Sequence, residues 1–365
     1  MAKLAPIPIR NVYYLLCYAW GEWDAGEVVD LEQLGRMDHV HDLFGHILAR
    51  GVLSLARRGV DRGYAERQVE LAGVRGKLDL GATLKRGLLS QGRAICTVEE
   101  FTPDVLHNRI LLATLHRLYR TSGLDRRVRE DVRLAMDRLP GVGRVPLTLG
   151  LFRRVQLDRN QRQYRFLLSV CRLVLESTLL SEAGGEMRFA DFRRNRKRMW
   201  RLFELFVANF LVREQAEFQV SSQIGIDWFE ARERSPRALE LVPRMLPDVL
   251  AQSKDRRIVL DTKFYSKPVG VRFGRPRLRS SNLYQMFAYL SNRQAAYPVG
   301  PRHEGILLYA SIGEDLRIDL MLQGFRVQVR TLDLSRPWPQ VRGELLGLLQ
   351  GEEVQVGQAS IQGGS

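Results

Sequence analysis

Two aspartates and a lysine form the clearest candidate for chemistry in the sequence. Residues 246–265 read LPDVLAQSKDRRIVLDTKFY, so Asp248 precedes a polar stretch and Asp261 and Lys263 lie in the apolar run after it. Residues two apart on a strand share a face, so Asp261 and Lys263 are expected to project together. A hairpin turn at 253–255 would bring Asp248 beside them.

This combination of residue types suits metal-dependent hydrolysis of a phosphodiester. Two neighbouring carboxylates repel each other unless a cation lies between them, and their hard oxygens suit Mg²⁺ or Mn²⁺. A nearby ammonium can orient a water molecule or stabilise charge that develops on a phosphate. The pattern predicts Asp248 and Asp261 as metal ligands and Lys263 as a catalytic residue. The local sequence equally allows a surface hairpin with an ordinary ion pair between Asp261 and Lys263.

Two helices beside this hairpin carry further candidates. Glu204 lies among apolar residues, and a buried carboxylate there would need a partner such as the metal; an exposed position on the outer face is the alternative. Gln285 and Tyr289 are four residues apart, so they share one face of a helix and can reach a DNA backbone. Their alternative role is the polar edge of a packed helix.

The elements that position these residues predict an α/β fold, α+β overall. Helical periodicity and glycine-broken alternating runs predict helices and β-hairpins in an N-terminal region, residues 1–185. Its hairpins are expected at about 64–104 and further helices within 105–180. Helices alternating with strands predict a second domain over 186–345. The Gly- and Gln-rich end, 346–365, is expected to be disordered.

Charge points to a polyanionic partner. Lys and Arg number 56 against 41 Asp and Glu, a net charge of +15, which suits double-stranded DNA. Two basic groups flank the candidate site and are predicted to contact phosphates, with solvated surface as the alternative. They comprise Arg193, Arg194, Arg196, Lys197 and Arg198, and then Arg272, Arg275, Arg277 and Arg279.

Other classes of protein are disfavoured. No apolar run approaches the roughly 20 residues of a membrane helix, and two prolines interrupt the N-terminal segment where a signal peptide needs a smooth apolar stretch. Three cysteines without a CxxC pair disfavour a disulfide framework or a structural zinc site. A cytoplasmic protein without membrane attachment is therefore expected.

The sequence resembles the McrC family, the nuclease subunits of McrBC modification-dependent restriction systems in the PD-(D/E)xK nuclease superfamily. The segments that carry the resemblance are IPIRNVYYLLCYAW, GVRGKLDLGATL, VEEFTPDVLHNRILLATL, MWRLFELFVANFL, LPDVL with VLDTKFY, and SNLYQMFAYL. The resemblance implies a restriction-endonuclease-like domain with a central mixed sheet. It places Asp248, Asp261 and Lys263 at catalytic positions, with Glu204 and Gln285 as accessory residues.

The resemblance also implies a partner. McrC proteins act with McrB, an AAA+ GTPase ring, and the N-terminal region is expected to bind that ring and stimulate its GTPase through the hairpins. This chain has no GxxxxGK[ST] motif, so GTP is expected on the partner. The prediction is a Mg²⁺-dependent DNA endonuclease subunit of a GTP-dependent restriction complex. The alternatives are a standalone repair or junction nuclease and a non-catalytic activator of a GTPase.

Overall fold

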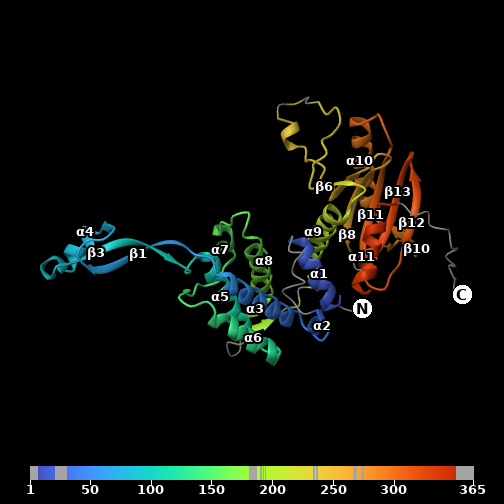
Figure 1. The fold of residues 1–365 in the computed structure, drawn as a ribbon. Helices are drawn as coiled ribbons and strands as arrows, with labels where there is room; N and C mark the ends of the chain where they lie inside the picture. Colours follow the sequence, from blue (N-terminus) through green and yellow to red (C-terminus); the bar gives the residue numbers. More distant parts are fainter. Residues whose placement is uncertain are drawn as a thin grey trace. The chain divides into compact units, whose positions relative to one another are not determined.

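A computed structural model describes residues 7–20, 31–180, 187–189, 191, 193, 195–232, 235, 237–265, 269–272 and 275–350. The chain divides into two compact units, Glu22–Phe192 and a discontinuous unit made of Met1–Gly21 and Arg193–Ser365. Figure 1 shows the ribbon. In the described ranges, no helix combines the length and apolar character needed to cross a membrane.

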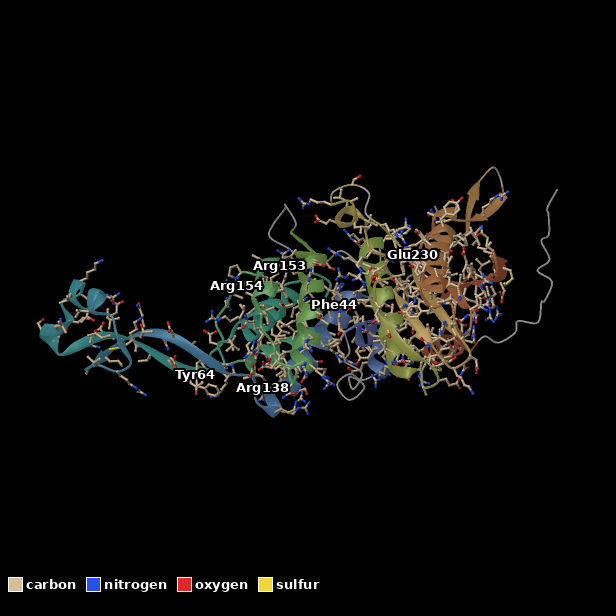
Figure 2. The ribbon with its side chains drawn as sticks, turned by 90° about the horizontal axis from the view of Figure 1, so that it is seen from above. Phe44, Tyr64, Arg138, Arg153, Arg154 and Glu230 are labelled. Atoms are coloured by element: carbon tan, nitrogen blue, oxygen red, sulfur yellow. The ribbon has the colours of Figure 1, made fainter. Side chains whose placement is uncertain are left out.

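The unit Glu22–Phe192 is built on packed helices. Phe44, Leu115, Val132 and Leu167 are fully or almost fully buried in their core, and Figure 2 shows Phe44 among the helices. Two short strands pair antiparallel after the last helix. The elements are α2 (Leu31–Leu34), α3 (Val40–Arg58), α5 (Leu106–Tyr119), α6 (Arg126–Asp137), α7 (Leu149–Arg154), α8 (Arg162–Ser177), β4 (Thr178–Leu180) and β5 (Met187–Phe189).

A long hairpin projects from these helices (Figure 1). Its arms, β1 (Gly63–Ala72) and β3 (Arg93–Thr102), pair antiparallel along their whole length. The far end carries β2 (Lys77–Leu78), which also pairs with β3, then α4 (Leu80–Lys85) and a 3₁₀ turn, η2 (Leu88–Gln91). We call residues 63–102 the finger.

Buried polar groups fix the base of the finger, where its two strands begin and end, on the helices. The Asn108 side chain donates to the carbonyl oxygens of Asp61 and Pro103, each at 2.8 Å. The Tyr164 hydroxyl donates to Asn108 Oδ1 at 2.9 Å and accepts from the backbone N–H of Asp61 at 2.8 Å. Asp61 precedes β1 and Pro103 follows β3, so α5 and α8 fix the two arms together.

The discontinuous unit contains the mixed sheet that the resemblance implies. Its described strands form a six-stranded sheet in the order β12-β13-β11-β8-β7-β6, in which β8, β11 and β13 run parallel and the other neighbours antiparallel. A separate antiparallel pair lies outside it. The strands are β6 (Gln219–Ser222), β7 (Val249–Gln252), β8 (Arg257–Phe264), β9 (Val269–Arg272), β10 (Arg275–Leu278), β11 (His303–Ser311), β12 (Arg317–Leu322) and β13 (Phe325–Asp333).

Two helices cover opposite faces of β8. Phe203 of α9 (Arg196–Glu214) packs with Phe264, while Met286 of α10 (Ser280–Ala296) shares an apolar cluster with Val259. Side chains alternate along a strand, so positions 259 and 264 face opposite sides. The residues of β8 between them are therefore enclosed from both sides.

The N-terminal helix belongs with this sheet, which corrects the expected region 1–185. Asn11 of α1 (Ile9–Ala19) is buried and its amide donates to the carbonyl oxygens of Leu334 and Arg336, both at 2.7 Å. The first unit therefore begins after Gly21 and ends at Phe192.

The predicted disordered tail also begins too early. The last helix, α11, spans Trp338–Gly347, and Leu349 after it is completely buried. The chain is thus packed as far as residue 350. Residues 351–365 lie outside the described part of the chain.

Candidate active site

The β7–β8 hairpin places Asp248 beside the strand that bears the other candidates. Val249 pairs with Leu260, and the turn closes with the Ser253 N–H donating to the Arg256 carbonyl at 2.9 Å. Asp248 Oδ2 accepts from both the N–H and the hydroxyl of Thr262, each at 2.6 Å. The predicted hairpin is therefore present, and Thr262 orients the Asp248 carboxylate.

Asp261 and Lys263 lie on the same face of β8 and form an ion pair. Lys263 Nζ also donates to Gln285 Oε1 at 3.0 Å. Gln285 Nε2 donates to the Tyr289 hydroxyl at 2.6 Å, and that hydroxyl donates to the Leu246 carbonyl at 3.3 Å. The Lys263 ammonium is thus held between the Asp261 carboxylate and the Gln285 amide, and Tyr289 in turn holds that amide.

The three carboxylates influence one another electrostatically. Burial and the neighbouring Asp248 raise the pKa of Glu204 to about 7. Burial raises the pKa of Asp261 to about 6, against the opposing effect of Lys263, and burial also raises the pKa of Asp248. Each shift means that ionised carboxylates are disfavoured here, and a bound cation would relieve this.

The donor set of the two aspartates fits a hard divalent cation. The described hydrogen bonds to Asp248 use only its Oδ2, and the buried Oδ2 of Asp261, although beside Lys263, accepts no hydrogen bond from the described residues. Carboxylate oxygens of this kind suit Mg²⁺ or Mn²⁺. No three His, Cys, Asp or Glu side chains of the described ranges converge closely enough to hold a metal ion as they stand. Glu204 is therefore near the pair but not grouped with it.

Tyr289 does not occupy the predicted position of a DNA contact. Its side chain is only 4% exposed and its hydroxyl is engaged with Gln285 and Leu246. It supports Gln285 instead. The i, i+4 spacing correctly puts the two residues on one face, but that face packs on the sheet.

The predicted basic residues have different environments. Arg193 donates to the Ile7 carbonyl at 2.8 Å, and Lys197 is exposed on the first turn of α9. Arg198 forms part of that turn, where its N–H donates to the Asn195 side chain that caps the helix. Arg194 and the side chains of Arg272 and Arg275 lie outside the described part of the structure, and Arg277 is exposed.

Arg196 and Arg279 share an aromatic neighbour that the sequence analysis missed. Both guanidinium groups lie over the ring of Tyr265. The available signal was that Tyr265 stands two residues after Lys263, on the same face of an extended chain.

Comparison with known proteins agrees with this architecture. A sequence profile described as "McrBC 5-methylcytosine restriction system component" matches residues 13–310. The chain belongs to this family. It is 30% identical over 342 residues to the type IV methyl-directed restriction enzyme EcoKMcrBC of Escherichia coli K12, covering 94% of this chain and 97% of that protein.

A solved structure shares the fold. It is a half-complex from the tetradecameric assembly of Thermococcus gammatolerans McrB AAA+ hexamers with bound McrC, with a TM-score of 0.55 and 18% identity. The alignment covers 94% of this chain and 75% of that chain. The sequence profile and the E. coli relative confirm the family implied by the sequence resemblance, and the solved structure confirms the fold.

Proposed function

We propose that this McrBC-family chain is the Mg²⁺-dependent DNA endonuclease subunit of a GTP-dependent restriction complex. One observation carries the proposal: Asp248, Asp261 and Lys263 converge on one hairpin, enclosed between α9 and α10, in a chain of this family. Mn²⁺ has the same preference for oxygen ligands and can replace Mg²⁺.

The chain's own residues have distinct roles in this proposal. Asp248 and Asp261 would hold the metal, which supplies a Lewis acid and a more acidic bound water. Lys263 presents a fixed positive charge to the phosphate as negative charge develops. Gln285 keeps Lys263 in place. Glu204 is proposed as an accessory carboxylate that contributes negative charge beside the aspartates.

We also propose that the finger docks on an AAA+ GTPase ring of the McrB kind, with GTP bound by that partner. Although α4 and the 3₁₀ turn pack on β3 at the far end of the finger, the finger still exposes several large apolar side chains. They are Tyr64, Val74, Leu78, Leu80, Leu84, Leu89 and Phe101. Figure 2 shows Tyr64 at the base of the finger, where its ring lies 5.2 Å from that of Phe101.

The basic residues around the sheet are proposed to contact double-stranded DNA. Lys197 and Arg277 are exposed, as phosphate contacts require. Arg193, Arg194, Arg198, Arg272 and Arg275 remain proposed contacts from their position in the sequence alone.

The test is metal-dependent DNA cleavage by the full chain together with its GTPase partner. Asp248→Ala, Asp261→Ala and Lys263→Ala should each abolish cleavage and leave partner binding and GTP hydrolysis intact. Asp255→Ala is the matched control, because Asp255 is exposed in the turn of the same hairpin. Normal cleavage by Asp261→Ala in Mg²⁺ would refute the assigned site, and cleavage without the partner would favour a standalone nuclease.

A further inference from the structure

Two guanidinium groups lie over one aromatic ring where β8 ends. Arg196 Cζ is 4.5 Å and Arg279 Cζ is 4.4 Å from the centroid of the Tyr265 ring. Tyr265 directly follows β8, two residues beyond Lys263. The two positive charges therefore share one aromatic ring, and that ring belongs to a residue two positions after the proposed catalytic Lys263.

Neighbouring groups hold this arrangement in place. Arg196 Nε donates to the Phe264 carbonyl at 3.3 Å. The Tyr265 ring lies 6.1 Å from the ring of Tyr309, whose hydroxyl accepts from the buried amide of Asn282 at 2.7 Å. Attraction between a guanidinium and an aromatic face adds to these contacts. Both cations are thus positioned before any ligand binds.

Neither arginine has a carboxylate partner within the ranges that the structure describes. Elsewhere in the same unit, Arg256 forms a two-pronged ion pair with Glu304 at 2.9 and 2.7 Å. Two unpaired like charges at one ring repel each other, and an anion between or beside them removes that cost. α9 begins at Arg196 and α10 follows Arg279, so helix N-termini add to the positive potential.

A phosphate of nucleic acid is the anion that fits this group. Guanidinium binds phosphate oxygens through two parallel N–H groups and is more weakly hydrated than an ammonium. Alternate residues of an extended chain are spaced by about 7 Å, so Tyr265 lies roughly one step of a DNA backbone away from Lys263.

We propose that Arg196, Tyr265 and Arg279 form a phosphate clamp that binds the DNA strand next to the phosphodiester to be cut. The proposal rests on the nuclease function proposed above. The proposal gives these two arginines a different role from the other basic residues of the two predicted groups. Among the described side chains of those groups, only Arg196 and Arg279 lie over the ring of Tyr265, the residue that follows β8.

The clamp can be tested through the salt dependence of DNA binding. The full chain is titrated with a short duplex in EDTA, so that no cleavage occurs, over about 50 to 200 mM salt. Arg196→Gln and Arg279→Gln should each reduce the slope of log affinity against log salt by about 0.9. Arg302→Gln is the matched control, because Arg302 also lies over an aromatic ring, that of Phe325 at 4.8 Å. It precedes β11, which runs parallel to β8, so it lies at the end of the sheet away from Tyr265.

Variants of the ring complete the test. Tyr265→Phe keeps the aromatic face and should bind like the wild type, whereas Tyr265→Leu should weaken binding as the arginine variants do. An unchanged slope in both arginine variants, an equal loss in Arg302→Gln, or no duplex binding by the wild type at low salt would overturn the clamp. Cleavage by Asp261→Ala would refute the active site alone, since binding is measured without metal.

Discussion

At the scale of single residues, Lys263 depends on side chains from a separate helix. Its ammonium contacts Gln285, which is held by the buried hydroxyl of Tyr289, and Tyr289 in turn donates to the Leu246 backbone. Burial raises the pKa of Tyr289, so this hydroxyl keeps its proton over the ordinary pH range. Tyr289 is therefore a positioning residue.

Tyr289→Phe should slow cleavage about 10-fold, the effect of roughly one hydrogen bond that orients a reacting group. Affinity for DNA should be unchanged, because the hydroxyl is buried. Single-turnover cleavage and duplex binding measure the two effects separately. Tyr284→Phe, at an exposed position of the same helix, should change neither. Weaker DNA binding by Tyr289→Phe would instead support the original prediction that Tyr289 contacts DNA.

The sequence predicted the residues whose arrangement is local. Asp261 and Lys263 share a face because side chains alternate on a strand, and Asp248 adjoins them because a short turn closes the hairpin. The roles of Thr262 and Tyr265 depend on neighbours that are distant in sequence, so spacing alone could not reveal them.

At the scale of elements, the far end of the finger depends on a glycine. Gly76 has φ +75°, and a Cβ there would lie 2.4 Å from the Thr97 carbonyl oxygen. The backbone of the loop therefore approaches β3 more closely than any side chain allows. The left-handed conformation alone costs other residues about 1–2 kcal/mol.

Gly76→Ala should displace the loop before β2 and reduce the proposed stimulation of the partner's GTPase, leaving the discontinuous unit equally stable. GTP turnover at saturating partner and thermal unfolding measure these outcomes. Gly81→Ala is the control, because its Cβ would meet Asp79 only at an ordinary 3.7 Å. Full stimulation by Gly76→Ala would argue against the finger as the docking element.

Elements with strong local patterns were predicted and others were not. The apolar run of β8 and the hydrophobic face of α8 are legible in the sequence. The edge strand β12 was missed although Ile318, Leu320 and Leu322 alternate with exposed residues, the pattern of a half-buried strand. The packing of α11 is set by α9 and β13, which are distant in sequence. Asn11 lies within α1 and bonds to carbonyls over 300 residues away, a role that local spacing does not reveal.

At the scale of the whole molecule, the discontinuous unit is completed by the first helix of the chain. Asn11→Ala would leave one buried and one partly buried carbonyl without their donor and should lower the free energy of unfolding of this unit by about 2 kcal/mol. Four of the five tryptophans, all but Trp23, belong to it, so tryptophan fluorescence during denaturation reports on this unit. Arg10→Ala, at an exposed position of α1, should change stability by less than about 0.5 kcal/mol. Equal stability of the Asn11 and Arg10 variants would contradict a stabilising role of the Asn11 hydrogen bonds in this unit.

The same discontinuity sets the order in which the chain can fold on the ribosome. Domains fold as units from the N-terminus during synthesis, and residues 22–192 are complete before α9 is made. α1 emerges first but packs on α9, and its Asn11 meets its carbonyl partners only when residues 334 and 336 have been made. A nascent or prematurely ended chain therefore carries the finger without a complete sheet-containing unit, and we expect the proposed DNA cleavage only from molecules whose synthesis has passed residue 336.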